Sequence, residues 1–405
     1  MALPIDASDV RKAHSAINGA IVRTPTTYSK GLSLITGADV FVKFENLQYT
    51  GSFKERGARN QLATLSEKER RRGVIASSAG NFAQAVAYHA SLLGVPARVV
   101  MPSATPQVKV ARTEALGATV SLHGRTFDDA RRHAESLANV DRLTLLSPFD
   151  APDVIAGQGT VAIEMLEDEP GLDVLVVPVG GGGLLSGMAV VCADMAPKVE
   201  LVGVQSEAFP GMVAALRGFP VPEGTTTIAE GIAVKQPGTM STEILRTLGI
   251  EVVLTSERRI EEAVCMYLEV EKVVAEGAGA APLAALLQHS ERFARRRVGL
   301  VLTGGNIDLT LLASVIIRGV VRSGRLAVLR ITLPDVPGAL GRLTTLVGEH
   351  GANIIEVRHG RHALSVQLRA AHVELTVECS TPDGIAELLT AISAAGYEVE
   401  VLPAP

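Results

Sequence analysis

Residues 174–184 read VLVVPVGGGGL, an apolar run followed by four glycines and a leucine. The apolar run predicts a strand that is buried on both faces, as in a parallel sheet covered by helices. Consecutive glycines let the chain turn so that successive N–H groups point inward at a helix start, although a flexible hinge is the alternative. A strand, a glycine turn and a helix in this order predict an open α/β sheet whose ligand binds at the carboxyl ends of the strands.

The same order recurs between Asp39 and Val321, where short apolar runs alternate with amphipathic stretches. Further strands are expected at Val40–Phe44, Val74–Ser77, Ala97–Val100, Thr119–Leu122, Leu201–Gln205 and Val298–Thr303, and helices include Phe82–Leu93, Pro106–Leu116 and Ile260–Glu271. Two more small-residue turns, Ser77–Asn81 and Gly304–Asn306, follow predicted strands. Because the carboxyl ends of parallel strands share one edge, the three turns are expected to form one site.

The composition favours a globular protein that acts on small molecules. At roughly 150 residues per domain, 405 residues predict two to three domains. Hydrophobic residues make up 47% and aromatic residues 3%, so the cores must be built mainly from Ala, Val, Leu and Ile. The net charge of −5 gives no electrostatic reason to expect nucleic acid or an anionic membrane surface as a partner.

Cysteine usage and the N-terminus indicate a soluble protein. Cys192, Cys265 and Cys379 form no CxxC pair, which gives no sign of a zinc site or a disulfide framework, and no metal ligand is assigned. The first 20 residues lack the apolar segment of a signal peptide, and no run approaches the roughly 18 apolar residues of a membrane span. A cytoplasmic location is therefore expected.

The chain changes character near residues 322–326, where a short basic segment predicts a linker. The expected domains are residues 1–321 and residues 327–403. In the second, strands are expected at Leu326–Leu333, Ile354–His359, His372–Cys379 and Tyr397–Leu402, and helices at Ala339–His350 and Pro382–Ala395. This βαββαβ order is the ferredoxin-like split motif.

Lys54 is the first candidate for chemistry. It follows a turn at Thr50–Gly51 and opens a predicted helix. A lone lysine in such a place is usually a solvated surface residue. Here apolar Phe53 precedes it, and small Gly57 and Ala58 follow, which would let a bulky group pack closely. A desolvated lysine has a lowered pKa and can form a Schiff base.

The three turns at strand exits supply complementary groups. The turn at Ser77–Asn81 opens a helix whose amides suit a carboxylate, although a capping serine without a ligand is equally consistent. The glycines after Val179 match neither GxGxxG nor the Walker pattern, which favours a phosphate monoester over a dinucleotide or ATP. Thr303 places a hydroxyl at a strand tip. A lysine, a carboxylate site, a phosphate site and a hydroxyl together are what pyridoxal phosphate and an amino acid require.

With these groups in view, residues of about 5 to 320 resemble the fold-type II pyridoxal-phosphate enzymes, specifically the serine/threonine dehydratases. The matching motifs are SFKERGA at 52–58, SSAGNFAQ at 77–84, GQGT at 157–160, GGGGL at 180–184, VGVQSE at 202–207, EGAGA at 276–280 and TGGN at 303–306. The C-terminal unit resembles an ACT regulatory domain. The resemblance implies a two-lobed α/β enzyme with mostly parallel sheets and a small lobe of about residues 48–150.

The resemblance also implies roles for individual residues. Lys54 would form the Schiff base with pyridoxal 5'-phosphate, and Glu276 would lie near the substrate. The other cofactor contacts would be Phe53 beside the ring, Asn81 at the ring hydroxyl, Thr303 at the ring nitrogen, and Gly180, Gly181, Gly182, Gly183 and Leu184 at the phosphate. The substrate carboxylate would be held by Ser78, Ala79, Gly80 and Asn81.

The implied activity is β-elimination from L-threonine, and also L-serine, to give 2-oxobutanoate or pyruvate and ammonia. Isoleucine biosynthesis is one setting for such a reaction. Serine racemase is the nearest alternative, but Ala79 stands where racemases place a proton-donating serine. Gln205 and Gly211 stand where racemases place carboxylate ligands of a divalent metal. A catalytically inactive amino-acid sensor is a further alternative, which the retained Lys54 disfavours.

ACT domains pair sheet to sheet and bind amino acids near the turn between the first strand and the first helix. The corresponding candidates are Asp335, Gly338, Ala339 and Leu340, with Asn353 and Ile354 facing them across the interface. Isoleucine or valine, or else serine or threonine, would be the effector. The alternative is a domain that only holds subunits together. A homodimer or homotetramer is expected.

Overall fold

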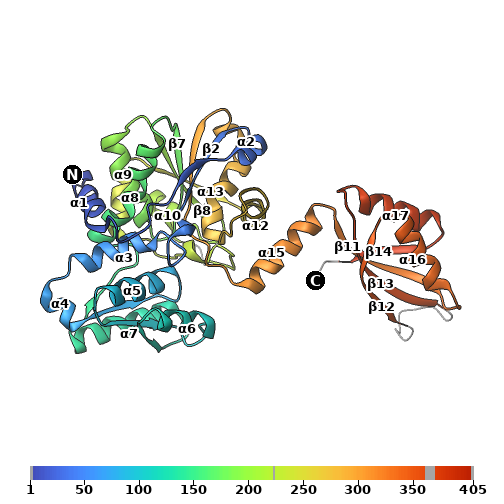
Figure 1. Cartoon of the computed structure of the whole chain (residues 1–405), viewed down its shortest axis with the longest axis horizontal. Coiled ribbons are helices and arrows are strands. Elements are labelled where there is room, and N and C mark those ends of the chain that lie inside the picture. The colour runs from blue at the N-terminus through green and yellow to red at the C-terminus, as the bar shows by residue number, and fades with distance from the viewer. Residues whose placement is uncertain (1–2, 222–223, 361–369, 403–405) are drawn as a thin grey trace. The chain divides into compact units, whose positions relative to one another are not determined.

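The computed structural model describes residues 3–221, 224–360 and 370–402. The chain forms two compact units, Met1–Ile307 and Asp308–Pro405 (Figure 1). Residues 1–2 and 403, at the ends of the expected domains, lie outside the described residues.

The first unit contains a small lobe built on a four-stranded parallel sheet in the order β5-β4-β3-β6. Its strands are β3 (Val74–Ser77), β4 (Ala97–Met101), β5 (Thr119–Leu122) and β6 (Thr144–Leu145). Its helices are α3 (Lys54–Ala63), α4 (Glu67–Arg72), α5 (Asn81–Leu92), α6 (Gln107–Ala115) and α7 (Phe127–Asp141). Alanine and valine dominate the core of this lobe, as the low aromatic content predicts.

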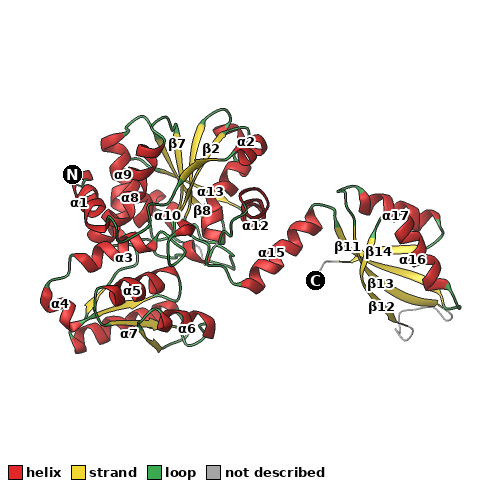
Figure 2. Cartoon of the chain, viewed as in Figure 1, coloured by secondary structure: helices red, strands yellow, loops and turns green. Residues whose placement is uncertain are grey.

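A large lobe completes the first unit around a six-stranded sheet in the order β1-β2-β10-β7-β8-β9 (Figure 2). Only the pairing of β1 with β2 is antiparallel among these strands. The strands are β1 (Thr26–Tyr28), β2 (Asp39–Phe44), β7 (Val174–Pro178), β8 (Glu200–Ser206), β9 (Glu251–Thr255) and β10 (Arg297–Leu302). The α-helices are α1 (Ala7–Ile17), α2 (Lys30–Thr36), α8 (Pro152–Asp168), α9 (Gly183–Met195), α10 (Gly211–Arg217), α11 (Thr239–Thr247), α12 (Glu257–Met266), α13 (Gly277–Gln288) and α14 (Ser290–Phe293). Shorter helical segments are η1 (Glu45–Leu47), η2 (Glu230–Ile232) and the π-helix η3 (Tyr267–Glu271).

The expected α/β architecture with mostly parallel sheets is confirmed. Three strands were not predicted, β1, β6 and β9, and each lies at the edge of its sheet. Edge strands bury less apolar surface, so their sequence pattern is weaker. The helix expected at Ile260–Glu271 begins earlier, at Glu257, and its last turn is the π-helix η3. That turn ends at Lys272, which adopts a left-handed backbone conformation with φ of 60°.

Helix α3, which begins with Lys54, crosses α8 at two glycines. A Cβ on Gly157 would lie 2.7 Å from the carbonyl oxygen of Arg56, and one on Gly57 would lie 2.4 Å from Nε2 of Gln158. The group that packs closely against Gly57 is therefore Gln158 of α8. Gly157 of the GQGT motif serves this close helix crossing, whereas Gly159 faces the carbonyl oxygen of Gly187 in the following helix α9, 2.7 Å from where its Cβ would lie.

Beneath this crossing lies a fully buried ion network centred on Arg56. Its guanidinium donates to both carboxylate oxygens of Glu45, at 2.8 and 2.7 Å, and to both of Glu164, at 2.7 and 2.8 Å. Lys43 Nζ donates to Glu164 at 2.6 Å. Burial opposes ionisation of Glu164, but the hydrogen bonds and charges of Arg56 and Lys43 hold its pKa down at about 2. The network fixes α3 against β2, η1 and α8.

The second unit begins with α15 (Leu309–Arg322) and continues as an antiparallel sheet in the order β12-β13-β11-β14. The strands are β11 (Leu326–Pro334), β12 (Asn353–Gly360), β13 (Ala370–Glu378) and β14 (Glu398–Leu402), and the helices are α16 (Ala339–Glu349) and α17 (Gly384–Ala394). Leu343 and Val347 of α16, and Leu388 and Ile392 of α17, pack on one face of the sheet. The expected βαββαβ order is confirmed.

The structure of residues 308–326 bears on the expected linker and on the expected end of the first domain. The segment expected as a linker, 322–326, contains the end of α15, a turn and the first residue of β11. By compactness, α15 groups with the second unit instead of the first. Among the described residues, no helix is both long enough and apolar enough to cross a membrane.

Candidate active site

Lys54 is presented by a turn that is fastened to the exit of strand β10. Ser52 forms an isolated antiparallel bridge with Gly304, and the Phe53 amide donates to the Thr303 carbonyl oxygen at 3.0 Å. The turn itself needs the left-handed conformation of Gly51, with φ of 75°. Lys54 and Thr303, 249 positions apart in the sequence, are thereby held in one place.

The Lys54 amine lies in a poorly solvated position. Its Nζ donates to the carbonyl oxygen of Pro148 at 2.9 Å and lies 5.0 Å from the centre of the Phe53 ring. Burial lowers the pKa of Lys54 from 10.5 to about 8, although the negative charge of Glu276 opposes part of this shift. The lowered pKa leaves more neutral, nucleophilic amine near neutral pH than an ordinary lysine has.

The lowered pKa predicts an unusual reactivity for Lys54 in the protein without cofactor. Its labelling by an amine-reactive reagent, followed by peptide mass spectrometry, is expected to rise with pH around a midpoint near 8. Deprotonation yields the reactive amine, so the rate increases as pH rises through the pKa. Exposed Lys30 in the same samples serves as the internal reference. Labelling of Lys54 that shows no midpoint near pH 8 would contradict the assignment.

Asn81 and Glu276 meet from opposite lobes. Asn81 is the first residue of α5, and its Nδ2 donates to Glu276 Oε1 at 2.8 Å. Glu276 caps α13, and its amide donates to the carbonyl oxygen of Gly304 at 3.0 Å. Burial raises the pKa of Glu276 to about 7, and the charge of Glu230 adds to this, while Asn81, Lys54 and Lys109 act in the opposite direction. Glu276 can therefore exchange a proton near neutral pH.

The residues expected to hold a carboxylate form the link between β3 and α5. Ser78 and Ala79 are half-buried and Gly80 is exposed. The amide of Gly80 donates to Ser78 Oγ at 3.3 Å, which shapes the turn. The first amides of a helix have no partner within the helix, and the helix dipole favours an anion there. This arrangement can accept the carboxylate of an amino acid.

Gly180, Gly181 and Gly182 lie between β7 and α9, and Gly183 is the first residue of α9. Gly182 has φ of 100° and directly precedes the helix, so a side chain there would be strained. A Cβ on Gly181 would lie 2.2 Å from the Phe149 ring, and one on Gly183 would lie 2.4 Å from the Phe149 carbonyl oxygen. Only glycine fits so close to Phe149, and the turn at the start of α9 offers its amides to an anion.

The segment Pro148–Phe149 joins the parts of the site. Pro148 accepts the hydrogen bond from Lys54, and Phe149 covers the glycine turn. On the other side, a Cβ on Gly231 would lie 3.5 Å from Glu276 Oε1, and one on Gly180 would lie 3.1 Å from the Gly231 carbonyl oxygen. These contacts link Lys54, Asn81, Glu276 and the glycine turn, whereas Leu184 packs in the apolar core of the large lobe.

Some members of the site were not found from the sequence. Pro148 acts through its backbone carbonyl, so no side-chain pattern signals it. Asn306 ends the TGGN motif and donates to Asn81 Oδ1 at 2.8 Å. The sequence could have pointed to Asn306 through its place in the TGGN motif. A glycine turn followed by an asparagine is common, however, and does not by itself indicate that the asparagine has a role.

The positions that correspond to a metal site in racemases are engaged otherwise. Gln205 Nε2 donates to the Val179 carbonyl oxygen at 3.1 Å, and its Oε1 accepts from the amides of Met212 and Val213 at 3.0 Å each. A Cβ on Gly211 would lie 2.6 Å from the Val234 carbonyl oxygen. Within the described ranges there is no group of three or more His, Cys, Asp or Glu side chains suited to a metal ion.

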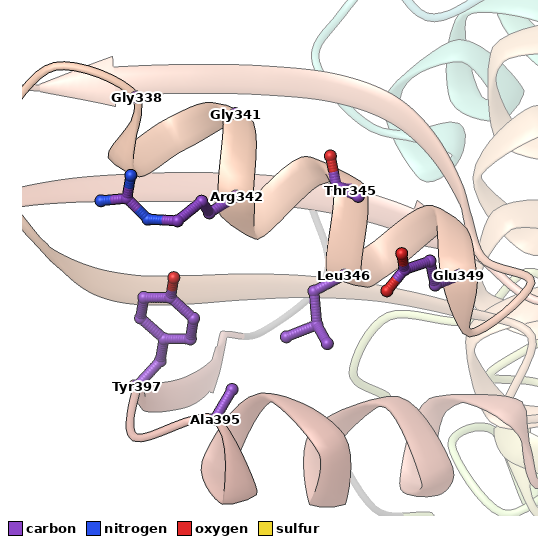
Figure 3. A pocket seen from close by; sticks show the side chains of 8 residues that line it. All are labelled: Gly338, Gly341, Arg342, Thr345, Leu346, Glu349, Ala395 and Tyr397. Atoms are coloured by element: carbon purple, nitrogen blue, oxygen red, sulfur yellow. The ribbon is translucent and has the colours of Figure 1, made fainter.

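The second unit has a groove of about 510 Å³ on its helical side (Figure 3). It is lined by Gly338, Gly341, Arg342, Thr345, Leu346, Glu349, Ala395 and Tyr397. In Figure 3, Leu346 points towards Ala395, Arg342 lies above Tyr397 at one end, and Glu349 lies at the other end.

The candidate effector residues do not all meet in one copy of this unit. Gly338, with φ of 85°, precedes α16 and lines the groove, and Ala339 and Leu340 pack on the core. Asn353 and Ile354 begin β12 beyond the other end of α16, about 16 Å of helix away. Asp335 lies in the turn before Gly338. Convergence of the two sets would need a second copy of the domain.

Comparison with known proteins agrees with this geometry. Residues 17–304 match the family described as pyridoxal-phosphate dependent enzymes, and residues 327–397 match the ACT domain. The chain is 43% identical over 400 residues to an L-threonine ammonia-lyase of Thermotoga maritima, which covers 98% of this chain and 100% of the relative.

Solved structures with a similar fold include two that each cover 78% of this chain. One is the processed form of threonine deaminase isoform 2 from Solanum lycopersicum, with a TM-score of 0.72 and 32% identity over 78% of this chain and 90% of that one. The other is maize serine racemase, with a TM-score of 0.72 and 29% identity over 78% of this chain and 98% of that one. The fold is therefore shared by lyases and racemases, and the choice between these activities depends on side chains.

Proposed function

The chain belongs to the family of pyridoxal-phosphate-dependent enzymes and carries a C-terminal ACT domain. We propose that it is an L-threonine ammonia-lyase. It would convert L-threonine to 2-oxobutanoate and ammonia by β-elimination, and L-serine to pyruvate and ammonia. The observation that carries the proposal is the half-buried Lys54 amine with its pKa near 8, held among an anion-binding glycine turn, Asn81 and Glu276. The full-length similarity to a threonine ammonia-lyase supports the same substrate.

The residues present fit pyridoxal phosphate. The glycine turn leaves no room for side chains and opens α9, which suits a phosphate monoester. Thr303 is buried at the strand exit, where a hydroxyl can meet a neutral ring nitrogen. Asn81 would hold the ring hydroxyl, and Phe53 would lie beside the ring. When bound, the cofactor withdraws electrons from the substrate and so acidifies its Cα proton.

The protein's own groups then perform three tasks. Ser78, Ala79, Gly80 and Asn81 bind and orient the substrate carboxylate at the start of α5. The neutral Nζ of Lys54 takes the Cα proton, and its lowered pKa matches this base to neutral pH. Glu276, with its pKa near 7, holds or releases a proton close to Lys54. After the β-hydroxyl leaves, hydrolysis gives the 2-oxo acid and ammonia.

Lyase activity is favoured over racemisation by the group at residue 79. Inverting the configuration at Cα requires an acid on the face opposite Lys54. Ala79 has no proton to donate, and Gln205 uses both ends of its amide within the protein. These side chains favour elimination, although the fold itself is compatible with either reaction.

Steady-state assays on the purified full-length protein test the proposed function. We expect 2-oxobutanoate and ammonia to form in equal amounts from L-threonine, together with a yellow colour and borohydride-dependent attachment of the cofactor to Lys54. D-serine formation from L-serine should be negligible beside pyruvate formation. A colourless protein that forms no adduct would refute the enzyme assignment, whereas predominant D-serine formation would favour the racemase.

The ACT domain indicates regulation by an amino acid. We propose that an amino acid such as isoleucine binds near Gly338 and changes the activity of the first unit. Truncation after Arg322 is expected to leave a folded catalytic unit, since residues up to Ile307 form their own compact unit. The truncated protein should keep its threonine activity and lose its response to isoleucine, as measured by initial rates with and without the effector. Identical responses of the intact and truncated proteins would refute regulation through this domain.

We also propose an oligomeric state and a cellular location for the protein. Pairing of ACT domains would bring Gly338 of one copy near Asn353 of another, so a homodimer or homotetramer is expected in solution. Light scattering after size-exclusion chromatography measures its mass. We also propose a cytoplasmic location.

A further inference from the structure

Asn306 follows the exit of β10 and hydrogen-bonds to three separate segments. Its Nδ2 donates to the Thr50 carbonyl oxygen at 2.7 Å and to Asn81 Oδ1 at 2.8 Å. Its Oδ1 accepts from Arg112 Nη1 at 3.3 Å. Thr50 belongs to the turn that presents Lys54, Asn81 opens α5, and Arg112 lies on α6. One amide therefore connects the lysine turn to two helices of the small lobe.

The partners of Asn306 determine which end of its amide points where. The Thr50 carbonyl oxygen can only accept a hydrogen bond, so the group facing it must be the NH₂ of Asn306. The Arg112 guanidinium can only donate, so the group facing it must be the Asn306 oxygen. Both ends are thus assigned by groups that have a single role. Both hydrogens of the Asn306 NH₂ are used, one by Thr50 and one by Asn81.

The orientation of the Asn306 amide also fixes that of the Asn81 amide. Because Asn306 donates to Asn81, the Asn81 atom at that contact must be its oxygen. Its NH₂ group then faces Glu276, to which it donates one hydrogen at 2.8 Å. Among the described residues no second acceptor is found for this NH₂, so its other hydrogen can face a ligand. With the opposite orientation, Asn81 would offer an oxygen instead, and two donors would meet at Asn306.

We propose that Asn306 is a positioning residue that fixes Asn81 with a hydrogen-bond donor towards the ring oxygen of the cofactor. This inference rests on the proposed function and explains how the protein orients Asn81 for its contact with the cofactor. A donor stabilises the ionised form of a ring hydroxyl, and an acceptor would destabilise it. The tight packing of the turn keeps Asn306 in place, since a Cβ on Gly51 would lie 3.0 Å from Asn306 Oδ1.

Two substitutions test whether Asn306 acts through the hydrogen bonds that it donates or only through the space that it fills. Asn306→Asp keeps the shape of the side chain and its contact with Arg112, but a carboxylate has no hydrogen to donate to Thr50 or Asn81. Asn306→Ser removes the amide without adding charge. The matched control is Asn46→Ser, because Asn46 Nδ2 also donates to a backbone carbonyl beside the site, that of Val274 at 3.2 Å, without contacting Asn81.

The readouts are the affinity of the apoprotein for pyridoxal phosphate and the pH at which the visible absorption of the bound cofactor changes. Asn306→Asp is expected to weaken cofactor binding roughly 10- to 100-fold, as for the loss of one or two buried hydrogen bonds. It should also move the absorption midpoint to higher pH, because the ring oxygen loses its donor. Asn306→Ser should move the midpoint in the same direction by less, and Asn46→Ser should leave it in place.

Failure of this inference can be told from failure of the proposed function. If the unmodified protein takes up no pyridoxal phosphate, the proposed function and this inference are both overturned. If it is coloured and both Asn306 variants titrate like the Asn46→Ser control, the positioning role alone is overturned. Thermal melting of the apoproteins identifies a variant that does not fold, and in that case the comparison of Asn306→Ser with Asn46→Ser decides.

Discussion

Replacement of Lys54 by alanine is expected to lower the rate of 2-oxobutanoate formation by roughly 10²- to 10⁴-fold, the range lost when a positioned general base is removed. Lys54→Arg should be about as inactive, because a guanidinium stays protonated and cannot take the Cα proton. The measurement is the initial rate at saturating L-threonine and cofactor. Both variants should retain the fold, since the Lys54 side chain makes a single hydrogen bond, to Pro148, among those found in the described residues.

Lys30→Ala is the control for Lys54. Lys30 is exposed at the start of α2, and its loss should leave the rate unchanged. Borohydride treatment followed by peptide mapping adds an independent readout, because the unmodified protein should carry the cofactor on the peptide with Lys54. Full activity of Lys54→Ala would show that another group removes the proton and would refute the assignment of the base.

Replacement of Arg56 by methionine is expected to destabilise the protein by about 3–5 kcal/mol, the usual cost of removing one partner from a buried ion network. The substitution leaves Glu45 and Glu164 buried, with exposed fractions of 0% and 3%, and without the guanidinium that binds both. The measurement is the free energy of unfolding from urea denaturation. Because α3 begins at Lys54, cofactor affinity should fall as well.

The pH dependence of stability gives a second test of the network. The pKa of Glu164 is about 2 in the folded protein, below its ordinary value of 4.5. A group with a depressed pKa contributes stability that is fully present above the unfolded value and is lost as pH falls through the folded value. The unmodified protein should therefore lose stability between about pH 4.5 and 2, and Arg56→Met should lose this part of the pH dependence.

Arg71→Met is the matched control for Arg56. Arg71 pairs with Glu67 on the surface of α4, with side chains 69% and 82% exposed. Exposed pairs contribute little, so the free energy of unfolding should change by no more than about 0.5 kcal/mol. Equal effects of the two substitutions would mean that the buried network does not stabilise α3.

The parts of the site that the sequence predicted are those encoded by short-range patterns. The glycine turn after Val174–Val179 lies between β7 and α9, and Thr303 directly follows β10. Each such feature depends on a few consecutive residues, because a strand, a turn and a helix start are local structures. The ACT-like order of strands and helices was predicted for the same reason.

The parts that the sequence did not predict depend on residues far apart in the chain. Gly57 was expected to let a bulky group pack closely, but the sequence did not show that the group is Gln158 of α8. The sequence did not predict the buried network in which Arg56 makes two hydrogen bonds to Glu45 and two to Glu164. A charged residue near a helix start is usually solvated. These outcomes are set by tertiary packing, which removes water and brings distant groups together.

The order of the elements could be predicted from the local sequence, as could the kinds of groups near the strand exits: a lysine, a glycine turn, a hydroxyl and an asparagine. What those groups can donate or accept depends on tertiary contacts. Asn81 has the same composition in either orientation, and its partners Glu276 and Asn306 lie 195 and 225 residues away. An amide carries a donor and an acceptor on one rotatable group, so its role is fixed by the neighbours that folding brings to it.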